Sequence, residues 1–440
     1  MKKRLLATLL SSTLAMTSLA GCSSKSENGD MVTELTKPIT IEMWHYMNGG
    51  QAEVLNEIIE DFNATNDKGI TVNAISQGSI VDLNKKVISA AQSNSLPAII
   101  NVYPDVATGL IEDKKLVNLS SFINDKNVGM ADEMDDFVDA FIQETSQWNN
   151  GEVYGLPMTK STEVLYVNKN MLESLGYTLE DLEDLTFEKL AEISNKAVTE
   201  LGVAGFGFDS SSNAFISSLK MDGLDFVDSK GTINVDNEWV REYMTFFQKQ
   251  AKSGAFRIAG EDKFLSNPFV NQKMLCYQGS SAGYAYLNNN GAFEIAVVEV
   301  PVFEGKDKAV MQQGASLFVT NNVSAEAQYA AYEFVKFATN AENTAKFATA
   351  TGYLPVRKSA IETEIVKNIL NDETSLYSQV YNVAQKSLPY AYYTPAINNA
   401  QSARTVAQEK YEAFMSGSIT DVEVLVDDIV SQVQTSIGRN

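Results

Sequence analysis

The sequence is poor in cysteine and histidine. It has two cysteines, Cys22 and Cys276, and one histidine, His45, in 440 residues. A structural zinc site takes four cysteine or histidine ligands at close spacing, which so few residues cannot supply. The chain also lacks a glycine-rich loop followed by lysine, the pattern that cradles nucleotide phosphates. We therefore expect no metal and no cofactor.

Positive charge is also scarce. Thirty-four Lys and Arg stand against 56 Asp and Glu, which gives a formal charge of −22. Such acidity repels polyanions, so we expect no nucleic-acid partner. With 44% hydrophobic and 20% charged residues the composition is that of a globular protein. The length exceeds the roughly 250–300 residues at which one hydrophobic core stops growing, so it predicts two lobes.

The N-terminus carries a short apolar run after three basic residues. Residues 5–19 are too few to span a bilayer, and Leu19-Ala20-Gly21-Cys22 follows at once. Small residues before a cysteine, followed by a polar linker at 23–36, resemble a bacterial lipoprotein processing site. We expect residues 1–22 to be a signal peptide and Cys22 to carry lipid that anchors the protein outside the cell membrane. Ordinary cleavage without lipid is the alternative.

Strand patterns and helical apolar spacing alternate between residues 39 and 103. This alternation predicts a parallel or mixed sheet that is covered by helices on both faces. Ligands of such sheets lie beyond the carboxyl ends of the strands. The loops that contain His45 and Asp105 should therefore face one crevice.

The stretch 151–157 and the strand pattern at 164–167 predict a crossing between two folded bodies. A glycine-bounded hairpin is followed by Pro157, which bars regular helix. A β-hairpin inside a single domain has the same local pattern. Further crossings are expected near Gly314 and Pro355. We assign residues 37–157 and 317–355 to lobe 1, and residues 158–316 and 356–440 to lobe 2.

Several motifs are spread over residues 39–416: Met43-Trp44-His45, Pro97-Ala98-Ile99 with Tyr103, Tyr154-Gly155-Leu156-Pro157 with Leu165-Tyr166 and Asn168-Lys169, Gly314-Ala315-Ser316, and Thr351-Gly352-Tyr353-Leu354-Pro355. Together they resemble the family 1 sugar-binding group of extracellular solute-binding proteins of ABC importers. The resemblance implies a two-lobe α/β fold of the type II periplasmic-binding-protein kind, with mixed sheets flanked by helices and a hinge between the lobes. It also implies a monomeric receptor, not an enzyme, that closes on a small-molecule solute and delivers it to the transmembrane subunits of the ABC permease.

Within that group the pattern is most similar to members that bind sn-glycerol 3-phosphate. Their ligand residues match Ser161, Ser280, Gly314, Tyr353 and Arg404 in this sequence. The resemblance implies that most of these residues gather around the phosphate. A guanidinium group, hydroxyls and a backbone N–H suit a tetrahedral oxyanion. His45 and Asp105 are further candidates for solute contacts.

Other positions depart from that pattern. An aromatic residue in the second loop is here Ile80, and a glutamate after the third strand is here Pro104 followed by Asp105. No tryptophan lies between Gly205 and Ser212, where those members place a stacking platform. The phosphate end of the site is therefore better supported than the glycerol end. A different phosphate ester, a glycerophosphodiester and a neutral oligosaccharide remain alternatives.

A secreted hydrolase and an adhesion lipoprotein are the alternatives from other classes. Gly279-Ser280-Ser281-Ala282-Gly283 fits the nucleophile pattern of α/β-hydrolases and follows a strand. That catalytic order requires a histidine after the serine, and the only histidine, His45, precedes it. The sequence therefore favours a receptor over an enzyme.

The lipid anchor can be tested by detergent partitioning of the protein made in bacteria. We expect the wild type in the detergent phase and Cys22→Ala in the aqueous phase, because each buried methylene of an acyl chain adds about 0.8 kcal/mol. Cys276→Ala is the control and should partition like the wild type. Equal partitioning of wild type and Cys22→Ala into the aqueous phase would contradict the anchor.

Overall fold

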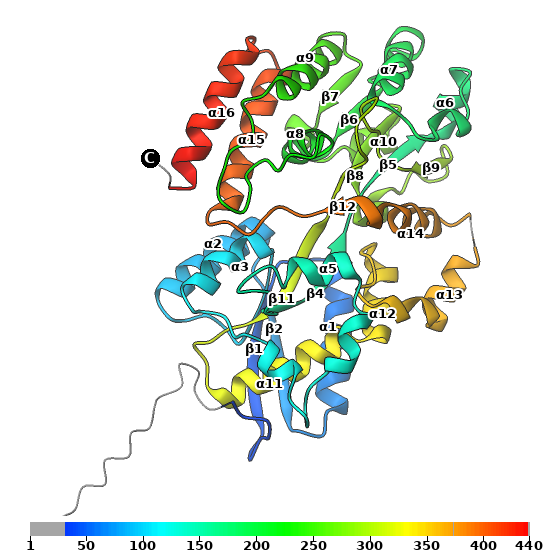
Figure 1. Ribbon diagram of the computed structural model, residues 1–440. Helices are drawn as coiled ribbons and strands as arrows, with labels where there is room; N and C mark the ends of the chain where they lie inside the picture. Colours follow the sequence, from blue (N-terminus) through cyan, green and yellow to red (C-terminus); the bar gives the residue numbers. More distant parts are fainter. Residues whose placement is uncertain (1–30, 373, 439–440) are drawn as a thin grey trace, which may run out of the picture.

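The computed structural model describes residues 31–372 and 374–438. The predictions for Cys22, for the signal peptide and for most of the linker therefore lie outside the described residues. The described chain forms two α/β lobes, one above the other in Figure 1. None of its helices is long and apolar enough to cross a membrane.

Lobe 1 is built on a mixed sheet with the strand order β2-β1-β3-β11-β4. Its strands are β1 (Ile39–His45), β2 (Ile70–Ser76), β3 (Ile99–Val102), β4 (Gly155–Ser161) and β11 (Gln313–Val319). β1 pairs in parallel with β2 and β3, whereas β11 runs antiparallel to β3 and β4. β11, from the second half of the described chain, lies between β3 and β4, so both halves contribute strands to the sheet of lobe 1.

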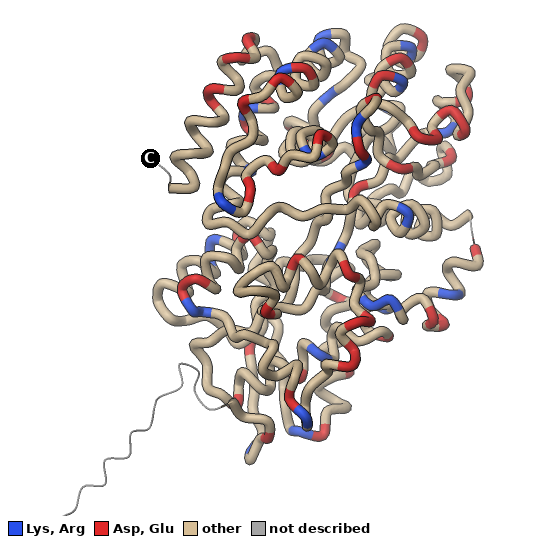
Figure 2. Tube along the Cα trace, in the orientation of Figure 1, with Lys and Arg blue, Asp and Glu red and all other residues tan. Residues whose placement is uncertain are grey.

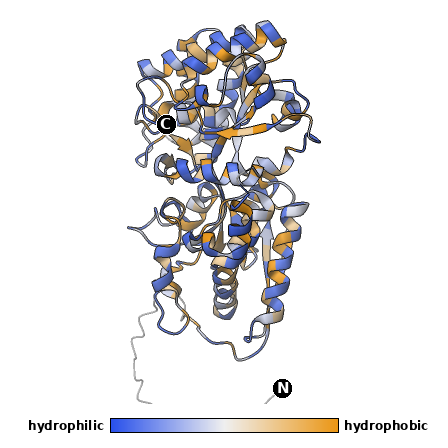
Figure 3. Cartoon of the chain, turned by 90° about the vertical axis from the view of Figure 1, so that its right-hand side faces the viewer, coloured by the Kyte–Doolittle hydropathy of each residue, from blue (hydrophilic) through white to orange (hydrophobic). Residues whose placement is uncertain are grey.

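Helices cover the sheet of lobe 1. They are α1 (Gly50–Thr65), α2 (Ile80–Gln92), α3 (Pro104–Glu112), α4 (Ser120–Ile123), α5 (Asp139–Glu144), α11 (Ala325–Ala338), α12 (Ala341–Thr351) and α13 (Glu364–Leu370). α1 shows why they pack: Leu55, Ile58 and Phe62 recur on one face and are buried. The Phe62 ring meets Phe334 of α11 edge to face at 5.2 Å. Helices of both lobes carry a hydrophobic and a hydrophilic side (Figure 3).

Lobe 2 has its own mixed sheet, in the order β7-β6-β8-β5-β9. The strands are β5 (Glu163–Asn168), β6 (Phe206–Phe208), β7 (Phe256–Ile258), β8 (Cys276–Ser280) and β9 (Ile295–Val298). The helices are α6 (Lys169–Ser174), α7 (Phe187–Leu201), α8 (Ser211–Lys220), α9 (Glu238–Lys252), α10 (Ser266–Val270), α14 (Leu376–Ser387), α15 (Ala400–Met415) and α16 (Val422–Ser436). Aromatic rings fill the core, where Phe187 lies 5.3 Å from Phe247 and 4.5 Å from Phe303.

Short elements complete the fold. β10 (Val310–Met311) pairs with β12 (Ala391–Tyr392). The 3-10 helices are η1 (Ala131–Asp136), η2 (Glu180–Leu182), η3 (Gly260–Asp262), η4 (Ser281–Tyr286), η5 (Lys358–Glu362) and η6 (Leu388–Tyr390). The predicted fold class, two lobes with mixed sheets flanked by helices, is confirmed.

The chain changes sheets at positions that differ from the expected boundaries. β4 remains in the lobe 1 sheet to Ser161, four residues beyond Pro157, and β5 of lobe 2 begins at Glu163. Pro157 stays inside the sheet because β4 is an edge strand and is irregular next to this proline: Pro157 pairs with Ser316 and Thr159 with Ala315, which leaves Met158 as an extra residue. A missing N–H is tolerated at such a place. β11 likewise begins at Gln313 rather than 317.

The third crossing also comes later than expected. We placed it after residue 355, but η5 and α13 still pack against α12 of lobe 1. α14 then packs on β9 of lobe 2, so the change of lobe falls between α13 and α14. Apolar contacts of Val366 with Ala345 and Ala360 hold α13 on lobe 1.

Gly314 occupies a backbone position at the second crossing that other residues cannot adopt. Its φ is +112°, and a Cβ atom there would lie 1.7 Å from the Thr159 carbonyl oxygen. Gly151 has a similar φ of +95° but no atom within 4 Å of the Cβ position. Alanine substitutions at the two glycines therefore distinguish the cost of a strained backbone from the cost of a steric clash between Cβ and the neighbouring strand.

We expect Gly314→Ala to lower the free energy of unfolding by about 3 kcal/mol or more, since strain and a clash with backbone add. Gly151→Ala should cost about 1–2 kcal/mol, because only the left-handed backbone is penalised. Urea unfolding followed by circular dichroism measures both. Equal losses would show that β11 moves away from Thr159 at little cost.

Candidate functional site

A cavity of about 580 Å³ lies between the two lobes. Tyr103 and Asp105, which follow β3, line it from lobe 1. Asp209, which follows β6, and Ser280, at the end of β8, line it from lobe 2. The carboxyl ends of strands from both sheets therefore face the same cavity, the usual ligand position in open α/β sheets.

The structure brings together the five residues matched from the sequence: the cavity is lined by Ser161, Ser280, Gly314, Tyr353 and Arg404, and also by Asp105. Ser161 ends β4 of lobe 1, and its Oγ accepts a hydrogen bond from Ser280 Oγ of lobe 2 at 3.2 Å. These two hydroxyls join the lobes at the edge of the cavity.

Tyr353 is held on the lobe 1 wall by its neighbours. Its hydroxyl lies 3.3 Å from Tyr46 Oη, which in turn lies 3.1 Å from Thr159 Oγ1. The ring stacks on Phe347 with centroids 5.8 Å apart. Burial raises the pKa of Tyr353 above its usual value, so the hydroxyl remains protonated and can donate a hydrogen bond.

Arg404 projects from α15 and is oriented by a chain of amide and carboxylate groups. Its Nη2 donates to Asn213 Oδ1 at 2.6 Å. Asn213 Nδ2 donates to Glu163 Oε1 at 2.9 Å, and Gln278 Nε2 donates to Glu163 Oε2 at 3.0 Å. Because a carboxylate only accepts hydrogen bonds, Glu163 fixes the amide of Asn213 with its oxygen toward Arg404.

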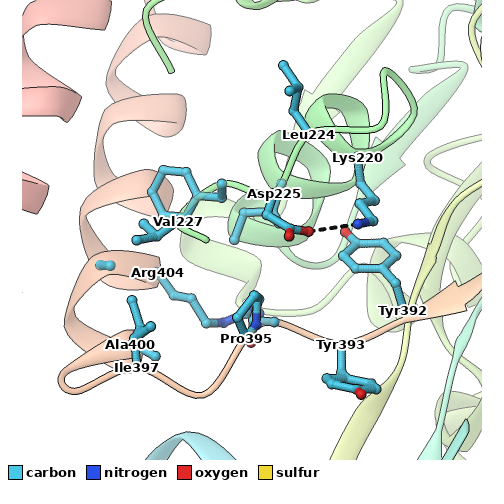
Figure 4. Close-up of a pocket in the computed structure, with 14 residues that line it drawn as sticks. Lys220, Leu224, Asp225, Val227, Tyr392, Tyr393, Pro395, Ile397, Ala400 and Arg404 are labelled. Atoms are coloured by element: carbon cyan, nitrogen blue, oxygen red, sulfur yellow. Dashed lines mark hydrogen bonds and ion pairs between the residues drawn. The ribbon is translucent and has the colours of Figure 1, made fainter. Parts of the chain in front are cut away.

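The guanidinium group of Arg404 forms no ion pair with a carboxylate of the described residues. Within the described residues no carboxylate oxygen lies within 4.0 Å of its guanidinium group, although Lys220 nearby pairs with Asp225 at 2.7 Å. Figure 4 shows both side chains around the hollow beside Tyr392 and Pro395. Arg404 can therefore offer its remaining N–H groups to an acceptor in the cavity.

Four carboxylates also line the cavity: Asp105, Glu144, Glu163 and Asp209. Burial raises the pKa of Asp105 and of Glu163, and it raises the pKa of Asp209 to about 7. Of these four carboxylates, only Asp105 was predicted from the sequence as a contact of the solute. Asp209 follows a strand and could have been found from the strand-end rule, whereas nothing in the sequence separates Glu144 from a surface acid.

Glu144 belongs to a buried ion pair at the floor of the cavity. Its Oε2 accepts from Lys160 Nζ at 2.5 Å and from Gln312 Nε2 at 2.7 Å. Lys160 is fully buried and also donates to the Gly314 carbonyl oxygen at 3.2 Å. Glu144 therefore balances the positive charge of Lys160 within lobe 1, and the Gly314 carbonyl oxygen at the second crossing accepts a further hydrogen bond from it.

His45 does not line the cavity, although we expected its loop to face it. The ring is buried, and its Nδ1 accepts a hydrogen bond from the Met47 backbone N–H at 3.1 Å. Burial lowers the pKa of His45 to about 4, so the ring is neutral at physiological pH. Among residues 31–372 and 374–438 no group of three or more His, Cys, Asp or Glu is arranged to hold a metal.

The chain is similar to known proteins over most of its length. A profile of the bacterial extracellular solute-binding protein family matches residues 57–372. The sn-glycerol-3-phosphate-binding periplasmic protein UgpB of Rhizobium meliloti is 23% identical over 414 residues, which cover 90% of this chain and 94% of that protein. UgpB of Escherichia coli is 23% identical over 401 residues, with 88% and 90% covered.

Solved structures share the fold. UgpB from Mycobacterium tuberculosis in complex with glycerophosphocholine has a TM-score of 0.78 at 20% identity and covers 92% of this chain and 99% of its own. The cyclic alpha-maltosyl-1,6-maltose binding protein from Arthrobacter globiformis has a TM-score of 0.75 at 19% identity, with 92% and 100% covered. The chain therefore belongs to the bacterial extracellular solute-binding protein family, whose members serve ABC importers as extracytoplasmic receptors and not as enzymes.

Proposed function

We propose that the protein captures a phosphorylated small polyol or sugar, such as a glycerol phosphate, between its lobes and delivers it to the ABC permease. The observation that carries the proposal is Arg404, a cation on the cavity wall that pairs with no carboxylate of the described residues. Ser161, Ser280 and Tyr353 add hydroxyl donors around the same cavity. Such donors form charge-assisted hydrogen bonds to a phosphate without a further counter-charge.

The relatives support the same solute class. The Rhizobium meliloti relative is named for sn-glycerol 3-phosphate, and the Mycobacterium tuberculosis structure contains glycerophosphocholine. The positions matched to that group at the phosphate end all line the cavity. We also propose that lipid on Cys22 holds a monomer at the outer face of the cell membrane.

A neutral oligosaccharide is the second candidate, and the four cavity carboxylates favour it. Buried carboxylates accept hydrogen bonds from sugar hydroxyls, whereas they repel a phosphate dianion. The Arthrobacter globiformis protein is named for a cyclic maltosyl-maltose, and a Listeria monocytogenes protein with a TM-score of 0.78 was solved with cycloalternan. Under this candidate Arg404 would donate to hydroxyl oxygens.

Arg404→Ala separates the two candidates. For sn-glycerol 3-phosphate we expect a loss on the order of 2–5 kcal/mol, about 30- to several-thousand-fold in affinity, since a desolvated dianion loses its charge partner. Calorimetry with sn-glycerol 3-phosphate, glycerophosphocholine and maltotriose measures the change. Lys410→Ala, which removes a cation from the same helix outside the cavity lining, is the control. A change within about threefold for the tightest phosphate probe, or maltotriose as the tightest probe, would reject the phosphate proposal.

The two-lobe architecture with crossings near Thr162 and Gln312 predicts closure on the solute. Small-angle scattering should show a smaller radius of gyration with saturating solute than without it. Arg404→Ala at the same solute concentration is a matched control and should remain like the free protein. An unchanged radius at full occupancy of the wild type would count against a closing receptor.

A further inference from the structure

We propose that Asp105, Glu144 and Gln312 form an acceptor group that binds hydrogen-bond donors of the solute, either hydroxyls or an ammonium group. The three residues come from α3, from α5 and from the β10–β11 connection, and all line the cavity. This inference rests on the proposed function, in which the cavity holds a small solute. It identifies the part of the cavity lining that would contact the hydrogen-bond donors of the solute.

Glu144 is the fixed member of the acceptor group. It is more than nine-tenths buried, and only its Oε2 is engaged, by Lys160 and Gln312. No hydrogen bond to Oε1 is made within the described residues. The carboxylate is thus held in place by one oxygen and leaves the other for a donor in the cavity that it lines.

The side-chain oxygen of Gln312 is a second acceptor of the group, and it is observed independently of Glu144. The residue is 4% exposed, and Nε2 points to Glu144 because the amide oxygen cannot donate a hydrogen bond to a carboxylate. This orientation fixes Oε1, which is buried and has no donor within hydrogen-bond distance among the described residues. A buried acceptor without a partner costs about 1–3 kcal/mol, so a solute donor would relieve a real cost.

Asp105 extends the group toward Arg404. Its Oδ1 accepts from Thr394 Oγ1 at 3.3 Å, and no bond to Oδ2 is made within the described chain. Burial raises the pKa of Asp105 most, Arg404 lowers it, and the charge of Glu144 raises it again. The neighbouring acceptors repel one another, so a donor placed between them is favoured over water or an acceptor.

The test uses probes that differ only in their donors. sn-Glycerol 3-phosphate, 3-aminopropyl phosphate and propyl phosphate share a phosphate on a three-carbon chain, and the last has neither hydroxyl nor ammonium. We expect the wild type to bind the better of the first two about tenfold or more tighter than propyl phosphate, since two hydrogen bonds are gained. The tighter of the two identifies the donor as hydroxyl or ammonium.

Gln312→Met removes the unpartnered oxygen while keeping side-chain length. It should reduce the preference over propyl phosphate to less than about threefold. Gln250→Met, a buried glutamine of α9 outside the cavity lining, is the control and should keep the preference. The charge-neutral double variant Glu144→Gln/Lys160→Met should lose it as well without leaving a buried lysine unpaired.

Two results would overturn the inference while leaving the proposed function intact. One is a wild type that binds propyl phosphate as tightly as the other esters, and the other is a preference that survives in Gln312→Met. If no phosphate ester binds the wild type, the phosphate proposal fails, and maltotriose becomes the probe. The inference then stands if Gln312→Met weakens maltotriose about 3- to 10-fold, and it falls if that affinity is unchanged or if maltotriose does not bind.

Discussion

The buried pair of Lys160 and Glu144 sets the geometry of both the hinge and the cavity. Lys160 lies two residues before Thr162, where the chain leaves lobe 1, and its Nζ also binds the carbonyl oxygen of Gly314, where the chain returns. A buried ion pair is not by itself stabilising, because desolvation of both charges offsets their attraction. Here the additional donors and acceptors around the pair make separation costly, so the two crossings are held together.

The two walls of the cavity present different charged groups, a guanidinium group on lobe 2 and a carboxylate on lobe 1. On the lobe 2 side, Glu163 and Asn213 aim Arg404, while on the lobe 1 side, Lys160 and Gln312 aim Glu144. In each case hydrogen bonds from neighbouring side chains fix the charged group, which avoids reorganisation when the solute arrives. Preorganisation on both walls suits a receptor that binds by closing two rigid lobes.

The sequence predicted the architecture better than the boundaries or the chemistry of the cavity. Alternating strand and helix patterns predicted a parallel or mixed sheet, because hydrophobic periodicity is a local property, and the length predicted two lobes. The two-lobe fold with mixed sheets was implied by the family resemblance. The first lobe boundary was placed at Pro157, before the end of β4, because the pairing that keeps this proline in the sheet is made with β11, a strand distant in the sequence. Glu144 and Glu163 were missed because burial of an acid depends on tertiary contacts. His45 was misplaced because its ring is buried and accepts a hydrogen bond from the Met47 backbone N–H instead of lining the cavity.

The acidity of the protein does not exclude an anionic solute. The acidic and basic residues of Figure 2 are spread over both lobes, and exposed charges are screened beyond about 8–10 Å at physiological salt. Inside the cavity, however, Arg404 shares the lining with Asp105, Glu144, Glu163 and Asp209, where screening is weak. A phosphate ion alone would pair with Arg404 but would leave the four carboxylates without hydrogen-bond donors. A purely cationic solute would pair with the carboxylates but would leave Arg404 without an acceptor. The solute that we propose therefore combines an acceptor for Arg404 with hydrogen-bond donors for the carboxylates.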